Sequence, residues 1–290
     1  MTATPPAPST TATGPVHEAA PALRVSGLHK QFGGVAAVQE LDLEVAPGSV
    51  FGLLGPNGAG KTTVLNLVSG FLTPDRGRLE VHGEDATGRS SHEIARMGVA
   101  RTYQNVRLFE GMSVLDTVVA GFYQHRTSTF FDSVLALGRE RRERREFRER
   151  ALELLDRVGV NAHPEQIGTT LPYGDQRRLE LARALATNPR LLLLDEPTAG
   201  MNATESSSLG DLLHQLRDDG VTLVLIEHNM RLVMEYCESA AVIHFGQLLA
   251  TGTPRECVAQ RDVQEAYFGK RSDAERVETL LKLRRDPGGQ

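Results

Sequence analysis

The chain has 290 residues, 40% of them apolar, and a formal net charge of −5. This size allows a sizeable core in one large or two small domains, and the acidic balance argues against a general nucleic-acid binder, so we expect no nucleic-acid partner. No apolar run approaches the roughly 18 residues of a membrane span, and no secretory signal is evident, which predicts a cytosolic protein. Cys237 and Cys257 are too few and too far apart to predict a disulfide framework or a metal site.

The first part of the chain predicts a tail followed by an antiparallel sheet. Residues 1–22 are rich in Thr, Pro and Ala and predict a disordered tail. Leu23–Leu28 begins a first strand, and Leu41–Val45 alternates apolar and polar residues up to a Pro-Gly turn. Between them, Phe32 precedes two glycines. Its flat ring could cover an adenine, although a core position explains a strand aromatic equally well.

A glycine-rich stretch then follows the apolar run Val50–Leu54, which is typical of a buried parallel strand. Its glycines let backbone N–H groups converge on an anion at the start of the next helix. Lys61 can reach the β- and γ-phosphates, and the Thr62 hydroxyl can ligate magnesium. Since the order is strand, glycine loop and helix, we favour a nucleotide site over a chance turn. The phosphate loop comprises Gly55, Pro56, Asn57, Gly58, Ala59, Gly60, Lys61, Thr62 and Thr63.

The middle of the chain predicts a strand and then a helical insert. Val99–Gln104 is strand-like, and Gln104 ends it; in isolation a glutamine at a strand end indicates nothing. Apolar spacing becomes helical from about Ser113 to Val158. Within it, residues 139–150 interleave Arg with Glu, which favours a solvated helix face over a nucleic-acid arm.

A second loop-to-helix junction at Leu171–Ala186 precedes the apolar strand Leu191–Leu194. That strand delivers Asp195 and Glu196 to its carboxyl end, where ligands of open α/β sheets bind. There, Asp195 is suited to hold hydrated magnesium, and Glu196 to orient or deprotonate an attacking water. An acidic pair at a helix N-terminus is the plainer alternative.

Two further strand patterns complete the predicted core. Thr222–Ile226 is a buried strand that presents Glu227 and His228, and a ring nitrogen of His228 could contact a γ-phosphate, although a lone His needs support from other motifs. A hairpin is predicted around Phe245-Gly246, and helices and a polar tail follow from about Thr253.

Five motifs stand in one order, and that order resembles the ATP-binding cassette (ABC) family. They are the phosphate loop, Gln104, the signature segment Leu171–Gln176, Leu194–Pro197 and His228. The resemblance spans residues 23–270, with a helical subdomain at about 106–180 and a charged C-terminal tail at 271–290. It implies an α/β P-loop NTPase of the ABC ATPase type, with a mixed sheet core, an antiparallel β subdomain and a helical subdomain, and it implies ATP and Mg²⁺ as cofactors.

The resemblance also implies residue roles and a dimer. Gln104 corresponds to a lid-loop residue that senses magnesium and the transport partner, Phe32 to the adenine-stacking aromatic, and His228 to the switch histidine. Two such domains, either two copies or a pair of paralogous ATPases, meet head to tail. The ATP held by one chain then contacts the partner's signature residues, which here are Tyr173, Gly174 and Asp175.

Finer features resemble the ATPases of bacterial branched-chain amino acid importers. These work with two polytopic permeases and, indirectly, a periplasmic binding protein, at the cytoplasmic face of the inner membrane. Urea or amide importers and lipopolysaccharide exporters have similar ATPases, and a P-loop phosphotransferase is a remoter alternative. The chain departs from the broader family at Pro172, where Ser is usual, and at Asn202, where Asp is common. We expect these changes to weaken the signature and to alter contacts between subunits. The sequence segments that carry the finer resemblance are Arg101–Phe109, Tyr173–Glu180, Ala199–Asn202, Ile226–Met230, Thr251–Pro254 and Glu265–Gly269.

Overall fold

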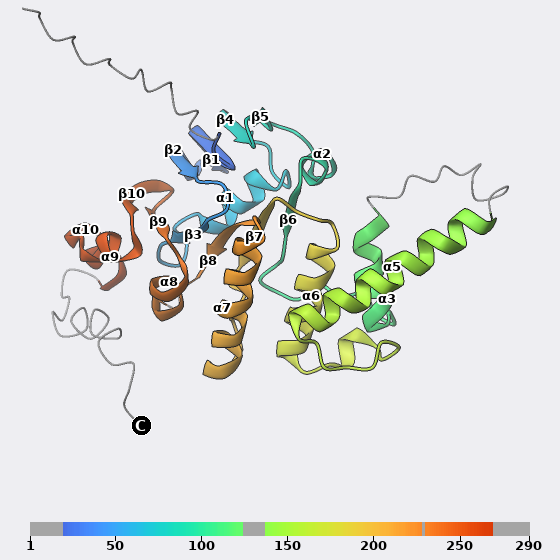
Figure 1. Cartoon of the computed structure of the whole chain (residues 1–290). Helices are drawn as coiled ribbons and strands as arrows, with labels where there is room; N and C mark the ends of the chain where they lie inside the picture. Colours follow the sequence, from blue (N-terminus) through green and yellow to red (C-terminus); the bar gives the residue numbers. More distant parts are fainter. Residues whose placement is uncertain (1–19, 124–136, 228–229, 269–290) are drawn as a thin grey trace, which may run out of the picture.

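A computed structural model describes residues 20–123, 137–227 and 230–268 (Figure 1). Its strands form two sheets, and the helices surround the larger one. The strands are β1 Leu23–Phe32, β2 Val35–Val45, β3 Val50–Leu54, β4 Arg76–Val81, β5 Glu84–Asp85, β6 Val99–Arg101, β7 Leu191–Asp195, β8 Thr222–Ile226, β9 Ser239–His244 and β10 Gln247–Gly252. The helices are α1 Lys61–Val68, α2 Ser91–Arg96, α3 Val114–Phe122, α5 Leu137–Val158, the 3₁₀ turn η2 Gly168–Thr170, α6 Tyr173–Leu185, α7 Ala203–Asp218, α8 Met230–Tyr236, α9 Pro254–Ala259 and α10 Arg261–Phe268.

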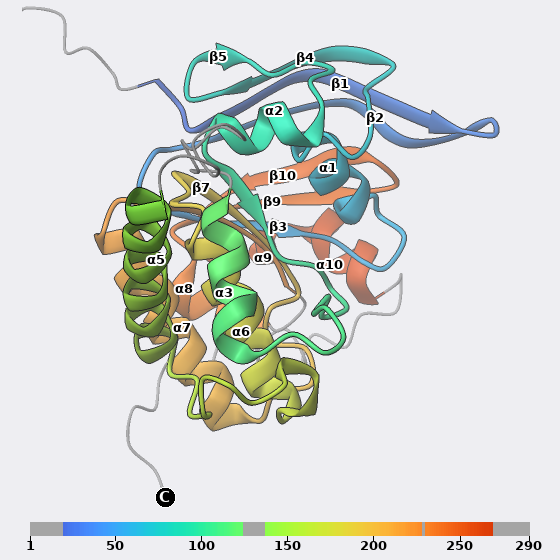
Figure 2. The same cartoon turned by 90° about the vertical axis from the view of Figure 1, so that its right-hand side faces the viewer.

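The smaller sheet is antiparallel and has the order β2-β1-β4-β5. Its long hairpin β1–β2 turns at Gly33-Gly34, directly after Phe32, where both glycines have positive φ. The sheet lies across one side of the molecule (Figure 2). Just before β1, Ala22 is fully buried and its N–H donates to the Val45 carbonyl at 2.9 Å, which attaches the entry to the first strand to β2.

The larger sheet has the order β10-β9-β3-β8-β7-β6 and is mixed. The strands β9, β3, β8, β7 and β6 run parallel to one another, and β10 pairs antiparallel to β9. This confirms the mixed core and the antiparallel subdomain. The run beginning at Val99 is shorter than expected, since β6 ends at Arg101 and Gln104 lies beyond it in a loop.

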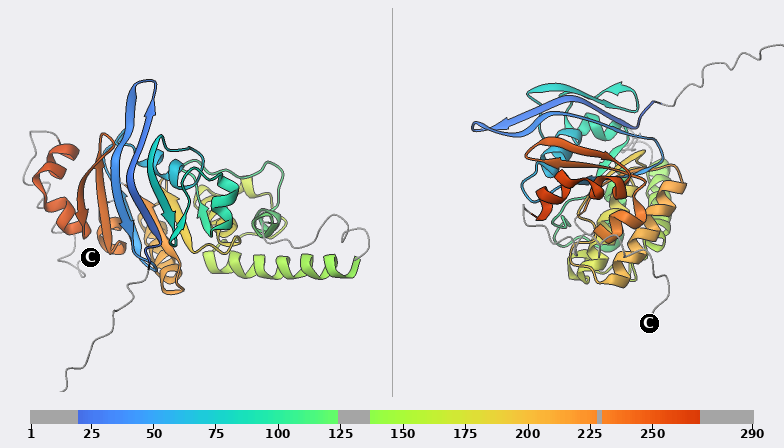
Figure 3. Two further views of the ribbon diagram at one scale, coloured as in Figure 1. Left: turned by 90° about the horizontal axis from the view of Figure 1, so that it is seen from above. Right: turned by 90° about the vertical axis from the view of Figure 1, so that its left-hand side faces the viewer.

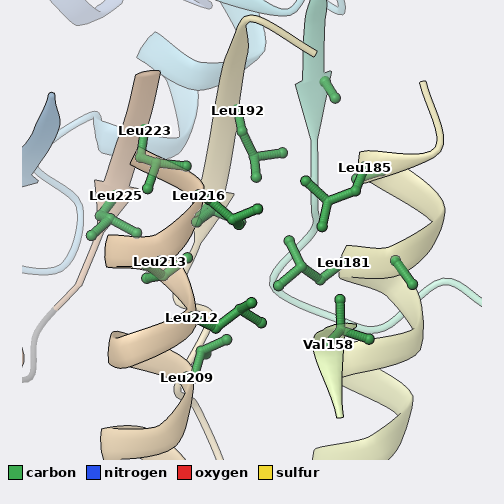
Figure 4. Packing of buried hydrophobic residues seen from close by; sticks show 14 of the residues in the cluster. Val158, Leu181, Leu185, Leu192, Leu209, Leu212, Leu213, Leu216, Leu223 and Leu225 are labelled. Carbon is green, nitrogen blue, oxygen red and sulfur yellow. The ribbon is translucent and has the colours of Figure 1, made fainter. Parts of the chain in front are cut away.

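Both faces of the larger sheet are buried, which explains the uninterrupted apolar runs in its strands. On β7, Leu191 and Leu193 face the antiparallel sheet and α1, whereas Leu192 and Leu194 face the helical side. Figure 4 shows the second face, where leucines of α6 and α7 meet those of β7 and β8. Fixing the strands on both sides holds their carboxyl ends in place.

The helices α3, α5 and α6 pack together into the predicted helical subdomain. Phe122 of α3 stacks on Phe147 of α5, with ring centroids 5.2 Å apart. From above, α5 extends well beyond the body of the molecule (Figure 3, left). Its Arg150 lies 4.0 Å from Glu146, one of the charge pairs expected for a solvated helix face. None of the helices in the described ranges has the length and apolar character needed to cross a membrane.

Candidate active site

The phosphate loop connects β3 to α1 as the spacing predicted. Gly55 and Gly60 have φ values of 150° and 103°, and neither position has room for a side chain. A Cβ at Gly55 would lie 2.2 Å from the Ile243 carbonyl oxygen, and one at Gly60 would lie 2.3 Å from that of Ala37. The loop is therefore held between β9 and β2. No side chain caps the start of α1, which leaves its first N–H groups for an anion.

Lys61 is buried beneath this loop, and its ammonium donates to the carbonyls of Gly55 at 2.7 Å and Pro56 at 3.0 Å. Burial lowers the pKa of Lys61, and the nearby carboxylates of Glu196 and Asp195 oppose that shift. The lysine is thus fixed in the loop and close to both acids. Thr62, at the same helix start, is exposed.

Asp195 ends β7 and is buried against Arg101, which ends the neighbouring strand β6. Their Nη2 and Oδ2 atoms are 3.2 Å apart, and the two side chains are 6% and 3% exposed. Burial raises the pKa of Asp195, and Arg101 opposes this. The Oδ1 atom is buried and accepts no hydrogen bond from the described residues, so a carboxylate oxygen remains for a hard cation.

Glu196 follows with a φ of 50°, a conformation that costs a non-glycine residue about 1–3 kcal/mol. Its N–H donates to the Ile226 carbonyl at 2.9 Å, and its Oε2 accepts from Gln104 Nε2 at 2.9 Å. The structure therefore brings together two residues that lie 92 positions apart in sequence. This strained residue lies directly after the carboxyl end of β7.

Glu227, to which the sequence assigns no role, is buried directly after β8. Its Oε1 accepts from the Thr198 N–H at 3.0 Å and from the Thr198 hydroxyl at 2.7 Å. This ties the end of β8 to the segment after Glu196. A carboxylate directly after a buried strand was the available signal. His228 lies outside the described residues, and its contact with a γ-phosphate stays a prediction.

The signature residues lie beside the segment that follows Glu196. A Cβ at Gly200 would lie 2.8 Å from the Tyr173 ring, so the two are in close contact. Pro172 is the N-cap of α6, as a proline-compatible helix start allows, and no side chain caps that end. Asn202 caps α7 by accepting from the Glu205 N–H at 2.9 Å, which gives this residue a structural role within the chain.

Phe32 is 46% exposed, at the tip of β1 and beside the turn that leads into β2. The same strand β2 supplies the Ala37 carbonyl that touches the phosphate loop at Gly60. An exposed ring there is not a core residue. The core alternative for Phe32 is therefore wrong, and the adenine contact stays a prediction.

This fold and loop define a P-loop nucleotide-binding protein. Residues 38–199, more than half of the chain, match the ABC transporter family. The high-affinity branched-chain amino acid transport ATP-binding protein BraF of Pseudomonas aeruginosa is 43% identical over 251 residues, which cover 86% of this chain and 98% of BraF. The chain therefore belongs to the ABC transporter family, as an ATP-binding cassette that couples ATP hydrolysis to transport.

Further relatives agree with this assignment. LivG of Escherichia coli, also a high-affinity branched-chain amino acid transport ATP-binding protein, is 41% identical over 251 residues, with 86% of this chain and 98% of LivG covered. The lipopolysaccharide export system ATP-binding protein LptB of Acidithiobacillus ferridurans is 36% identical, with 85% and 96% covered. A nucleotide-free ATP-binding cassette from an ABC transporter has a TM-score of 0.75 and 28% identity, over 86% of this chain and all of that one.

Proposed function

We propose that this ATPase drives a bacterial importer of branched-chain amino acids, at the cytoplasmic face of the plasma membrane. The observation that carries this proposal is the 43% identity to BraF over nearly its whole length, against 36% to the exporter protein LptB. An exporter or a urea or amide importer is the alternative. The phosphotransferase alternative explains Lys61 and Asp195, but leaves the signature segment and the contact between Gln104 and Glu196 without a purpose.

The site fits ATP together with magnesium. Thr62 and Asp195 supply hydroxyl and carboxylate oxygens, the ligand type that magnesium prefers, and Gln104 adds an amide oxygen. When bound, the metal ion neutralises charge on the β- and γ-phosphates. Lys61 and the N–H groups of the loop hold the phosphates, and Phe32 covers the adenine. Glu196 takes the proton of the attacking water, while Gln104 orients Glu196 through their 2.9 Å hydrogen bond.

Hydrolysis requires a second cassette, which is a paralogous ATPase or another copy of this chain. Tyr173, Gly174 and Asp175 contact the ATP of that partner. Because Pro172 offers no hydroxyl, the uncapped N-terminus of α6 supplies the contact through its N–H groups. His228 senses the γ-phosphate.

A cavity of about 690 Å³ is the proposed seat of a permease segment. It lies between β6 and α2 on one side and α3 and α6 on the other. Phe71, Tyr103 and Phe109 give it aromatic walls, and Arg107 and Arg183 give it positive charge. Two polytopic permeases would each place a short cytoplasmic helix in such a cavity, and a periplasmic binding protein would deliver the cargo to them.

The test is ATP hydrolysis by the assembled transporter in lipid vesicles, with its two permeases, second ATPase and binding protein. Leucine, isoleucine or valine is expected to stimulate hydrolysis, and the matched assembly with Glu196→Gln is the control for background turnover. Stimulation by urea or an amide alone would contradict branched-chain amino acids as the cargo, but it would still support an importer. Hydrolysis that responds to no permease would contradict the transport coupling.

A further inference from the structure

The inner face of α6 binds the loop that carries Gln104. Arg177 donates from Nη1 to the Tyr103 carbonyl and from Nη2 to the Gln104 carbonyl. Six residues along the helix, Arg183 Nη1 donates to the Arg107 carbonyl at 2.6 Å. Between them, Glu180 Oε1 lies 3.4 Å from the Arg107 N–H. Backbone groups at both ends of segment 103–107 are therefore hydrogen-bonded to side chains of α6.

The contacts are buried and charged. The side chains of Arg177 and Glu180 are 4% and 1% exposed, and Glu180 lies 3.7 Å from Arg177 and 3.6 Å from Arg183. Burial raises the pKa of Glu180, and both arginines oppose the shift. A buried ionic group is weak evidence for added stability, because desolvation offsets the attraction. The geometry of these contacts, however, fixes the distance and the relative orientation of α6 and the loop.

A small cavity of about 10 Å³ extends the same network towards β6. Thr102, Arg177 and Glu180 line it, and each contributes a buried polar atom that has no hydrogen-bond partner among the described residues: Oγ1, Nε and Oε2. This volume approaches the space that one water needs, and three polar atoms suffice to hold it. A water held there would join the residue before the loop to the same helix.

We propose that Arg177, Glu180 and Arg183 are positioning residues that make segment 103–107 move with α6. The same helix begins at Tyr173. When the partner's ATP contacts that end of α6, the movement of the helix therefore also places Gln104 against Glu196. This inference rests on the roles proposed above for Tyr173 and Gln104. The three residues act through the loop and touch neither the nucleotide nor the attacking water.

Arg178 provides a matched control. It is the neighbouring arginine on α6, but it donates to the Val158 carbonyl at 2.6 Å and to the Ser208 hydroxyl at 3.1 Å, away from the loop. Loss of either arginine perturbs the helix. Only the loss of Arg177 is expected to release the backbone of residues 103–107.

The test is amide hydrogen exchange of the full-length chain, compared for wild type, Arg177→Gln, Arg177→Lys and Arg178→Gln. The Arg107 N–H, which donates to Glu180 of α6, is the amide whose exchange reports on the loop. Hydrogen bonds to charged groups are worth about 1.5–3 kcal/mol, so Arg177→Gln is expected to speed exchange at Arg107 about tenfold or more. Arg177→Lys should recover part of the protection, and Arg178→Gln should leave it unchanged. Equal exchange in Arg177→Gln and Arg178→Gln overturns the proposal. If Arg177→Gln fails to fold, the more exposed Arg183→Gln carries the same test at Arg107.

Kinetics in the assembled transporter separate this proposal from the one on which it rests. Arg177→Gln should lower kcat with little change in the KM for ATP, and in the Gln104→Ala background it should lower kcat no further. Faster exchange in Arg177→Gln together with normal turnover in Gln104→Ala supports the link between α6 and the loop and contradicts the role of Gln104. Slow turnover in Gln104→Ala together with wild-type turnover in Arg177→Gln overturns the positioning role of Arg177 alone.

Discussion

The buried pair of Arg101 and Asp195 gives the sharpest prediction about the site. Replacing Arg101 by Gln leaves the Asp195 carboxylate 3% exposed and without its 3.2 Å partner. It also removes the donor that bonds Asn66 at 2.6 Å and Ser69 at 3.0 Å. Breaking one side of a buried ion pair typically costs about 3–5 kcal/mol, because a desolvated charge remains. We expect a loss of that size in the free energy of unfolding.

A double-mutant cycle measured by urea unfolding, without nucleotide and near neutral pH, isolates the pair. Adding Asp195→Asn removes the stranded charge, so the double variant should lose less than the sum of the two single variants, by about 1.5–3 kcal/mol. Losses that add to within about 0.5 kcal/mol would show that the two charges do not interact, and would refute this reasoning.

The same variant should show a characteristic pH dependence. Without Arg101, burial raises the pKa of Asp195 further above its unfolded value. A carboxyl with a raised folded pKa binds its proton more tightly in the native state, so the Arg101→Gln variant should approach wild-type stability in acid. Its deficit should grow as pH rises through the folded pKa. A deficit that is constant with pH would contradict this.

Three further changes test other parts of the chain. Lys61→Ala should weaken ATP binding at least about tenfold in a titration of the purified chain, because it removes the buried ammonium of the phosphate loop; unchanged affinity would contradict the loop assignment. Asn202→Ala should lower the free energy of unfolding by about 1 kcal/mol through loss of the α7 cap, whereas Asn202→Asp should keep it. Gly121→Ala should destabilise by about 1–3 kcal/mol, despite the better helix propensity of Ala, since its Cβ would lie 2.4 Å from the Arg183 carbonyl oxygen; a rise in Tm would refute the close α3–α6 contact.

Local patterns predicted much of the fold. The strands Val50–Leu54 and Thr222–Ile226 have the bounds that their apolar runs indicated, because burial on both faces leaves no polar interruption. The helix α7 was missed, although Asn202 followed three residues later by Glu205 is a capping-box pattern that could have found it. The Arg101–Asp195 pair could not be read from the chain, because it depends on β6 and β7 becoming neighbours.

The candidate site, like the fold, could be predicted from local patterns only in part. The phosphate loop is a contiguous motif, so Gly55 to Thr63 could be placed from spacing alone. The hydrogen bond from Gln104 to Glu196 and the grip of Arg177 on the loop join residues more than 70 positions apart. Only the tertiary fold sets such contacts. Nothing in the spacing of these residues along the chain predicts the two contacts.

The central claim is that Glu196 is the base for ATP hydrolysis in a transport ATPase. The most direct measurement is turnover by the Glu196→Gln variant in the assembled transporter, together with the amount of ATP that it retains. The amide cannot accept the proton, so turnover should fall about 10²–10⁴-fold while ATP stays bound. Turnover within about twofold of the wild type would contradict the account, because an interaction used only in the transition state cannot be lost at so small a cost.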